Sequence, residues 1–141
     1  MKRTASAVWN GDLKSGKGSV SSQSGVLNKT QYSFGTRFEN GVGTNPEELV
    51  AAAHAGCFTM AFSAQLGTAN LVPTQLETNA TLTFEKTEPG WTVTAIHLAV
   101  VGTVPGADDA TFQRLAEAAK KDCPISRLLK TNITMEAKLQ A

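Results

Sequence analysis

Two cysteines, Cys57 and Cys123, are the residues of this chain best suited to chemistry, because a thiolate is both a nucleophile and a redox group. A four-ligand zinc site would need both cysteines and both histidines, and no CxxC or HxxxH spacing supports one. Structural disulfides are not expected in a cytosolic protein of this size. A bridge between the two cysteines would therefore be transient and chemical.

The two thiols lie in different sequence settings. Cys57 falls in the middle of an apolar stretch that predicts a helix, beyond the reach of the N-terminal dipole, so it is inert unless a cation lies nearby. Cys123 precedes Pro124 and predicts the N-cap of a short helix, where backbone N–H groups favour a thiolate; Lys120 and Lys121 add positive charge. The residues alone make Cys123 the more acidic thiol and leave open which cysteine attacks first.

His54 lies three residues before Cys57 and is adjacent to it on a helix surface. This spacing allows a Cys/His hydrolase, in which the imidazole activates the thiol. No oxyanion-hole motif accompanies the pair, and a helical histidine is commonly held by a hydrogen bond. A non-catalytic dimeric stress or ligand-binding protein is a further alternative.

The segment Asn45-Pro46-Glu47-Glu48 predicts the start of a helix that runs to about Leu66. Asn45 suits the N-cap, Pro46 the first helical position, and Glu48 the third position of a capping box. Glu47 would lie about 15 Å from Cys57 along the helix axis, too far to touch the thiol. A Glu47 partnership with Cys57 would need a long intervening side chain or another subunit.

The same helix is apolar on nearly all sides, which predicts burial on nearly all sides. A single domain of 141 residues has few residues with which to cover such a helix on all sides, so we expect a second copy of the chain to cover part of it. The longest apolar run, residues 49–64, is interrupted by polar residues and falls short of the ~20 residues that span a bilayer. It predicts a core helix and no membrane segment.

The remaining patterns predict strands and helices in alternation. Strands are expected over residues 4–9 and within 26–38, with Arg37 at a strand end or in the following loop. The later segments are an antiparallel hairpin of residues 76–85 and 91–104, a helix from Asp108 or Asp109 to about Asp122, a short helix over 124–130, and a last strand over 133–139. The order predicts an α+β fold with antiparallel sheets on a long central helix.

Composition narrows the class of protein. With 13 Lys plus Arg against 12 Asp plus Glu, the formal charge of +1 gives no field to attract nucleic acid or an anionic membrane. Apolar residues make up 41% of the chain, enough for one folded domain over residues 1–141. The N-terminus has no apolar run typical of a secretory signal, so we expect a cytoplasmic protein.

Taken together, several segments resemble the OsmC branch of the OsmC/Ohr family of thiol peroxidases, over almost the whole chain. The most specific features are the Asn-Pro-Glu-Glu helix start, the cysteine in the middle of that helix and the late Cys-Pro, in that order. The matching segments are residues 24–28, 36–39, 43–49, 52–58 and 123–126.

The resemblance implies reduction of hydroperoxides, preferably organic ones, to alcohols by an intertwined homodimer with two interfacial active sites, in defence against oxidative and osmotic stress. At the matching positions, Cys57 would be the peroxidatic cysteine and Cys123 the resolving one. Arg37 would be the cation beside the thiolate, and Glu47 the carboxylate that holds Arg37. The resemblance implies no bound cofactor and no metal, only an external dithiol reductant, usually a protein-bound lipoyl group.

A guanidinium suits this implied role for physical reasons. It cannot lose its proton and offers several donors, enough for sulfur, peroxide oxygens and a carboxylate together. A positive charge beside Cys57 would favour the thiolate against the desolvation that keeps it protonated. Apolar neighbours such as Phe34, Phe38, Met60 or Phe62 are candidates to line a pocket for an alkyl hydroperoxide.

Overall fold

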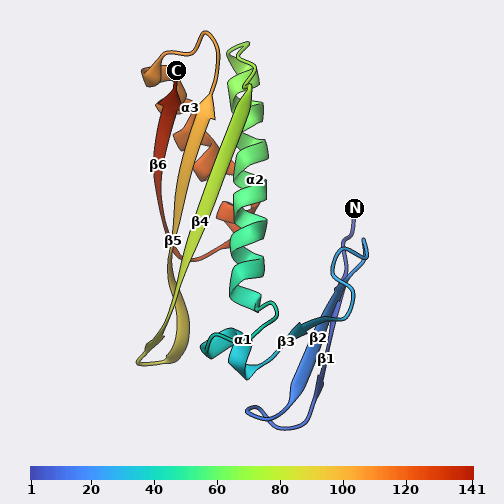
Figure 1. Ribbon diagram of the computed structural model, residues 1–141. Coiled ribbons are helices and arrows are strands. Elements are labelled where there is room, and N and C mark those ends of the chain that lie inside the picture. The colour runs from blue at the N-terminus through green and yellow to red at the C-terminus, as the bar shows by residue number, and fades with distance from the viewer. The chain divides into compact units, whose positions relative to one another are not determined.

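The computed structural model describes residues 1–141, which form two compact units, Met1–Leu49 and Val50–Ala141. The N-terminal unit holds a three-stranded antiparallel sheet, and the C-terminal unit holds a second sheet and the larger helices (Figure 1). The mixed α and β composition, the two sheets and the long helix confirm the predicted fold class. The prediction of one domain over the whole chain stays a prediction.

The sheet of the N-terminal unit has the order β1-β2-β3. Its strands are β1 (Ala5–Asn10), β2 (Lys17–Ser22) and β3 (Thr30–Tyr32), each antiparallel to its neighbour. The rings of Trp9 and Tyr32 lie on this sheet with centroids 5.5 Å apart. The predicted first strand is confirmed.

The segment that carries Arg37 is a short helix, α1 (Phe34–Phe38), so the prediction of a strand or loop there is wrong. A capping box starts the helix: Thr36 N donates to Ser33 Oγ at 3.2 Å, and Ser33 N donates to Thr36 Oγ1 at 2.8 Å. Phe34 and Phe38 suggested strand alternation, but their spacing also brings them together on a helix, with ring centroids 4.9 Å apart.

The long helix α2 (Pro46–Thr68) begins where the sequence predicts. Asn45 caps it, because Glu48 N donates to Asn45 Oδ1 at 2.8 Å. The side chain of Glu48 does not close the expected capping box; its Oε1 accepts from Thr44 Oγ1 at 2.6 Å. In a capping box this carboxylate would accept from the backbone N–H of Asn45; here it accepts from the Thr44 hydroxyl.

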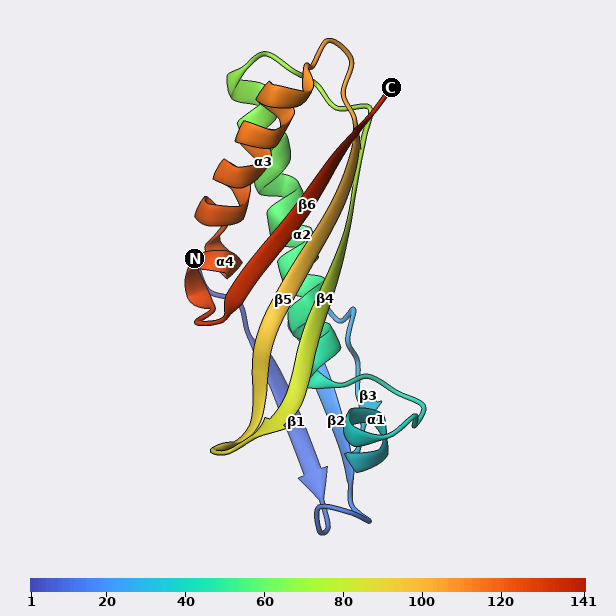
Figure 2. The same cartoon turned by 90° about the vertical axis from the view of Figure 1, so that its left-hand side faces the viewer.

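In the C-terminal unit, α2 and α3 (Asp109–Asp122) lie on the same face of the sheet β4-β5-β6 (Figures 1 and 2). Strands β4 (Gln75–Thr87) and β5 (Gly90–Thr103) form the predicted antiparallel hairpin. β6 (Asn132–Gln140) pairs parallel to β5, which corrects the expectation of purely antiparallel sheets. The chain returns through α3 and α4 (Pro124–Leu128), and such a helical crossover brings the next strand back in the same direction.

The core lies between this sheet and its two helices. Phe62 on α2 and Phe112 on α3 meet edge to face with centroids 5.0 Å apart. Its fully or nearly fully buried apolar residues are Phe58, Phe62, Leu66, Ile96, Leu98, Val100, Val104, Phe112, Leu115, Ala116, Ala119 and Cys123. This core fixes the middle of α2 and the start of α4 in one packed unit.

Helix α2 is buried along one face only, at His54, Phe58, Phe62 and Leu66. The prediction of burial on nearly all sides is therefore wrong within a single chain. The exposed face is apolar or small; Met60 there is 78% exposed. By length and composition α2 is also the one helix that could cross a membrane, a test that the core helix of a soluble protein passes as well.

Candidate active site

Cys57 on α2 and Cys123 at the start of α4 lie close enough for each thiol to shift the pKa of the other. Both are free thiols; Cys57 is partly buried and Cys123 fully buried. The structure thus brings together two cysteines that are far apart in the sequence.

The end of α3 and the start of α4 position Cys123. It is the C-cap of α3, where its N–H donates to Ala119 O at 2.9 Å, and the N-cap of α4, as the following Pro124 predicts. Ser126 N donates to Cys123 Sγ at 3.4 Å. Burial raises the pKa of the Cys123 thiol, but the hydrogen bonds of Ser126, with smaller contributions from Cys57 and the Ile125 backbone, outweigh it and lower the pKa overall.

Cys57 has the opposite electrostatics. Burial raises the pKa of the Cys57 thiol, the backbone N–H of Ile125 lowers it, and Cys123 raises it further; the net shift is upward. Within the C-terminal unit, Cys123 is therefore the more acidic thiol, as its predicted N-cap position before Pro124 indicates. A nucleophilic Cys57 requires a further positive charge.

His54 does not activate Cys57. It is fully buried on α2, and its Nε2 lies 2.7 Å from Ser126 Oγ, whereas no hydrogen bond joins it to Cys57. Burial lowers the pKa of His54 and keeps the imidazole neutral. This geometry gives no support to the Cys/His hydrolase.

Sequence reasoning missed Ser126 as a site residue. It is 8% exposed and touches both His54 and Cys123, the latter through Sγ to Oγ at 3.4 Å. One signal could have found it: Ser126 is the third residue after an N-cap, where the backbone N–H meets the capping side chain. The link to His54, 72 positions away, depends on the fold.

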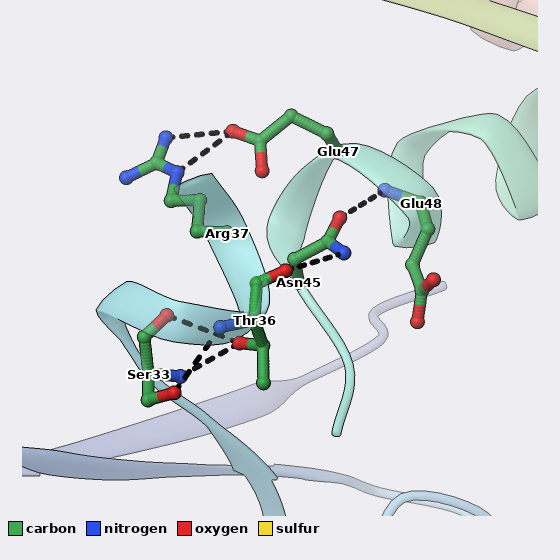
Figure 3. A network of polar contacts seen from close by, with 6 residues as sticks. All are labelled: Ser33, Thr36, Arg37, Asn45, Glu47 and Glu48. Carbon is green, nitrogen blue, oxygen red and sulfur yellow. Dashed lines mark hydrogen bonds and ion pairs between the residues drawn. The ribbon is translucent and has the colours of Figure 1, made fainter. Parts of the chain in front are cut away.

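Arg37 and Glu47 form an ion pair inside the N-terminal unit (Figure 3). Both contacts use one carboxylate oxygen, Glu47 Oε1, which lies 2.9 Å from Arg37 Nε and 2.7 Å from Nη2. The Glu47 side chain is 13% exposed and that of Arg37 is 40% exposed. The guanidinium also lies over the Phe38 ring, 5.4 Å from its centroid.

Two helix starts hold this pair in place. The capping box of Ser33 and Thr36 fixes α1, which carries Arg37, and the Asn45 cap fixes the first turn of α2, which carries Glu47. Asn45 also joins the two helices, because its Nδ2 donates to Thr36 O at 3.1 Å (Figure 3). Asn45 therefore ties the helix that carries Arg37 to the first turn of the helix that carries Glu47.

A pocket of about 260 Å³ adjoins Arg37 within the N-terminal unit. Its walls are mainly aromatic, a chemistry that suits an apolar group more than a hydrated one. The lining residues are Trp9, Leu13, Tyr32, Ser33, Phe34, Arg37 and Phe38.

The four predicted site residues thus form two pairs: Arg37 with Glu47, and Cys57 with Cys123. That the guanidinium lies beside the Cys57 thiolate stays a prediction, and so do the individual catalytic roles. Of the four apolar residues expected near a substrate, Phe34 and Phe38 line the pocket, whereas Phe62 is fully buried in the core.

Comparison with known proteins gives a consistent result. The family described as OsmC-like protein matches residues 38–138. Peroxiredoxin OsmC of Escherichia coli (strain K12) is 48% identical over 96% of this chain and 94% of its own length. Organic hydroperoxide resistance protein OhrB of Bacillus subtilis (strain 168) is 27% identical over 87% of this chain and 89% of its own length.

A solved structure supports the fold. The crystal structure of OhrB of Bacillus subtilis superposes with a TM-score of 0.68 and 26% identity, covering 97% of this chain and 98% of that one. The family match covers well over half of the chain, and the two cysteines of the chain interact with each other. The chain belongs to the OsmC-like protein family and is a cysteine-based thiol peroxidase, an oxidoreductase.

Proposed function

We propose that this peroxidase reduces organic hydroperoxides in preference to hydrogen peroxide, with Cys57 as the peroxidatic and Cys123 as the resolving cysteine. The observation that carries the proposal is the direct interaction of two free, mutually perturbed thiols, Cys57 and Cys123. The relatives of the Ohr type are named for resistance to organic hydroperoxides, which supports the substrate class.

The first step is attack of the Cys57 thiolate on one peroxide oxygen. The O–O bond breaks, the sulfur becomes a sulfenic acid, and the leaving alkoxide takes a proton to become an alcohol. Burial opposes the thiolate, so the step needs a cation at the sulfur. Arg37 supplies that charge and also donates to the leaving oxygen, while Glu47 fixes the orientation of the guanidinium.

The second step joins the two cysteines. Cys123 attacks the sulfenic sulfur of Cys57, a disulfide forms and water leaves. The depressed pKa of Cys123 supports its role here, because a larger fraction of it is thiolate at neutral pH. An external dithiol, such as a protein-bound lipoyl group, then opens the disulfide by exchange; no bound cofactor or metal takes part.

The substrate preference rests on the aromatic pocket beside Arg37. An alkyl or aryl group placed there removes apolar surface from water, a gain of roughly 25 cal/mol per Å² that hydrogen peroxide cannot obtain. The guanidinium at the pocket wall would bind the peroxide group, while the alkyl or aryl group of the substrate packs against the aromatic side chains.

The working unit of this proposal is a homodimer of intertwined chains. Support comes from the exposed face of α2, which presents Ala53, Gly56, Met60 and Ala64 to solvent in a single chain. Small residues let another helix approach closely, and an exposed methionine packs well in such a contact. Sedimentation of the protein should give the mass of a dimer; a monomeric mass would contradict this part of the proposal.

We propose further that the chain works in the cytoplasm as a defence against oxidative and osmotic stress. The relatives named for organic hydroperoxide resistance support the oxidative part of this role. Growth of a deletion strain on cumene hydroperoxide tests this role. Sensitivity that a Cys57→Ser copy of the gene does not relieve would support it.

The direct test of the proposed activity is a comparison of substrates. Reduced protein with a dithiol should consume cumene hydroperoxide faster than hydrogen peroxide and should leave an activated ester intact. Ester cleavage without peroxide loss would favour the hydrolase, and inertness toward all three would favour a binding protein. Equal rates with both peroxides would contradict the substrate preference alone.

A further inference from the structure

His54 is the largest buried polar side chain for which the two chemical steps above have no use. The side chain is fully buried, and its Nε2 lies 2.7 Å from Ser126 Oγ. Its Nδ1 is also buried but has no hydrogen-bond partner. Leaving a buried polar atom unpaired costs free energy. An arrangement with that cost calls for a compensating role of the Nε2 contact.

The contact continues to the sulfur of Cys123. Ser126 Oγ lies 3.4 Å from Cys123 Sγ, and Ser126 N donates to the same sulfur at 3.4 Å. His54 and Cys123 are fully buried and Ser126 is 8% exposed, so water contributes little to the solvation of this sulfur. Hydrogen bonds in such surroundings are electrostatically stronger than in water.

The hydrogens available decide the direction of the contacts. A neutral imidazole carries one N–H, and the Ser126 hydroxyl carries one hydrogen. If His54 Nε2 holds its proton, it donates to Ser126 Oγ, and the hydroxyl hydrogen is left for the Cys123 thiolate. The other tautomer would bury an unpartnered N–H at Nδ1 and would draw the hydroxyl hydrogen away from the sulfur.

We propose that His54 is a positioning residue for the resolving step: its neutral imidazole donates to Ser126, which in turn donates its hydroxyl hydrogen to the Cys123 thiolate. The inference rests on the proposed role of Cys123 and extends it. The chain of donors stabilises an anion without burying a cation beside it. Burial, which keeps His54 neutral, thus serves the arrangement instead of opposing it.

The step itself balances without any further reagent. The Cys123 thiol loses its proton, and its sulfur attacks the sulfenic sulfur of Cys57. The S–S bond forms, the S–O bond breaks, and the departing hydroxide takes up one proton to give water. The Cys123 sulfur is oxidised and the sulfenic sulfur is reduced, so the electrons balance between them.

Lys120 and Lys121 lie in the last turn of α3, next to Cys123, but neither is among the causes that shift the pKa of Cys123. The titratable side chain that faces Cys123 from α2 is Cys57, and the shift of His54 has burial as its only cause. On α4 the contributions come from Ser126 and from the backbone of Ile125, neither of which titrates. A change in the pH dependence of Cys123 therefore reports on Ser126 and His54.

The test measures the pKa of Cys123 in a Cys57→Ser background, where it is the sole thiol, by the ultraviolet absorbance of the thiolate. Adding Ser126→Ala or His54→Leu should raise that pKa. Adding His54→Gln should keep it near the background value, because the glutamine amide donates from a similar position but cannot be protonated. His97→Gln on β5 is the matched control and should change nothing.

The same substitutions in the chain with both cysteines give a kinetic test. After a single equivalent of hydroperoxide, Ser126→Ala should slow disulfide formation at neutral pH by about threefold for each unit of pKa increase, because a more basic thiolate is scarcer but also more nucleophilic. It should not slow sulfenic acid formation at Cys57. An unshifted pKa in Ser126→Ala and in His54→Leu would overturn the inference. If His54→Gln shifts the pKa of Cys123 as much as His54→Leu does, the imidazole does not act as a neutral hydrogen-bond donor, and the inference is wrong.

These outcomes separate the inference from the proposed function. Failure of the peroxidase assignment would appear as an absence of sulfenic acid at Cys57, whatever the pKa of Cys123. Ser126→Ala removes one oxygen atom and keeps the fold testable even if His54→Leu fails to fold.

Discussion

Arg37 binds Glu47 through a single carboxylate oxygen: Nε lies 2.9 Å and Nη2 2.7 Å from Glu47 Oε1. The two donors on one acceptor fix the plane of the guanidinium. A lysine at this position could supply the charge but not the plane. Replacing Arg37 by lysine therefore keeps the positive charge but removes the fixed orientation of the guanidinium.

Arg37→Lys should slow sulfenic acid formation at Cys57 by about a hundredfold, the cost of removing an oriented donor from a transition state. It should also raise the apparent pKa of the Cys57 thiol, because a point charge replaces the oriented guanidinium. Stopped-flow kinetics across a pH series measure both quantities. If neither changes, the cation that activates Cys57 is another group.

Glu47→Gln should slow the same step by less than Arg37→Lys does, because the cation remains but loses its anchor. Glu48→Gln is the matched control: it lies one residue on and bonds to Thr44 instead of Arg37. Second-order rates with cumene hydroperoxide distinguish the two variants. Equal rates for Glu47→Gln and Glu48→Gln would show that the ion pair does not position the guanidinium.

Cys123→Ser should consume one equivalent of hydroperoxide and then stop with Cys57 as a sulfenic or over-oxidised thiol. The serine hydroxyl cannot form the disulfide, so the sulfenic acid persists long enough to react with dimedone. Mass spectrometry of the adduct checks this outcome. A variant that passes through a normal intramolecular disulfide would remove Cys123 as the resolving residue.

Much of the fold follows from local sequence signals. The Asn45 cap and the helix start at Asp108 or Asp109 each set an element boundary within a few residues, because capping chemistry is local. The helix of Arg37 was missed since Phe34 and Phe38 satisfy a strand pattern and a helix pattern alike. In so short a segment, the Ser33–Thr36 capping box decides between them.

The candidate site was predictable only in part. The acidity of Cys123 follows from its position before Pro124, which the sequence displays. The contact of Ser126 with His54 does not, because it arises from the packing of α4 against α2 across 72 positions of sequence. The parallel pairing of β6 likewise depends on the path of the crossover. Long-range contacts of this kind leave no local signal.

The stability of the protein should fall as the pH is lowered below about 6.5, the usual pKa of histidine. The folded-state pKa of His54 lies below its usual value of 6.5, so the unfolded chain takes up a proton first. The stabilisation is complete above the unfolded pKa and is lost as pH falls toward the folded one. Thermal melts of wild type and His54→Gln should converge as pH drops, whereas His97→Gln should follow wild type.

In the proposed mechanism, Cys57 and Cys123 form one redox pair that turns over a hydroperoxide. The most direct measurement treats the reduced protein with one equivalent of cumene hydroperoxide and maps its peptides by mass spectrometry. We expect a Cys57–Cys123 disulfide within one chain, one equivalent of alcohol, and neither product in Cys57→Ser. Alcohol formation that persists in Cys57→Ser, or two cysteines left reduced after peroxide is consumed, would contradict it.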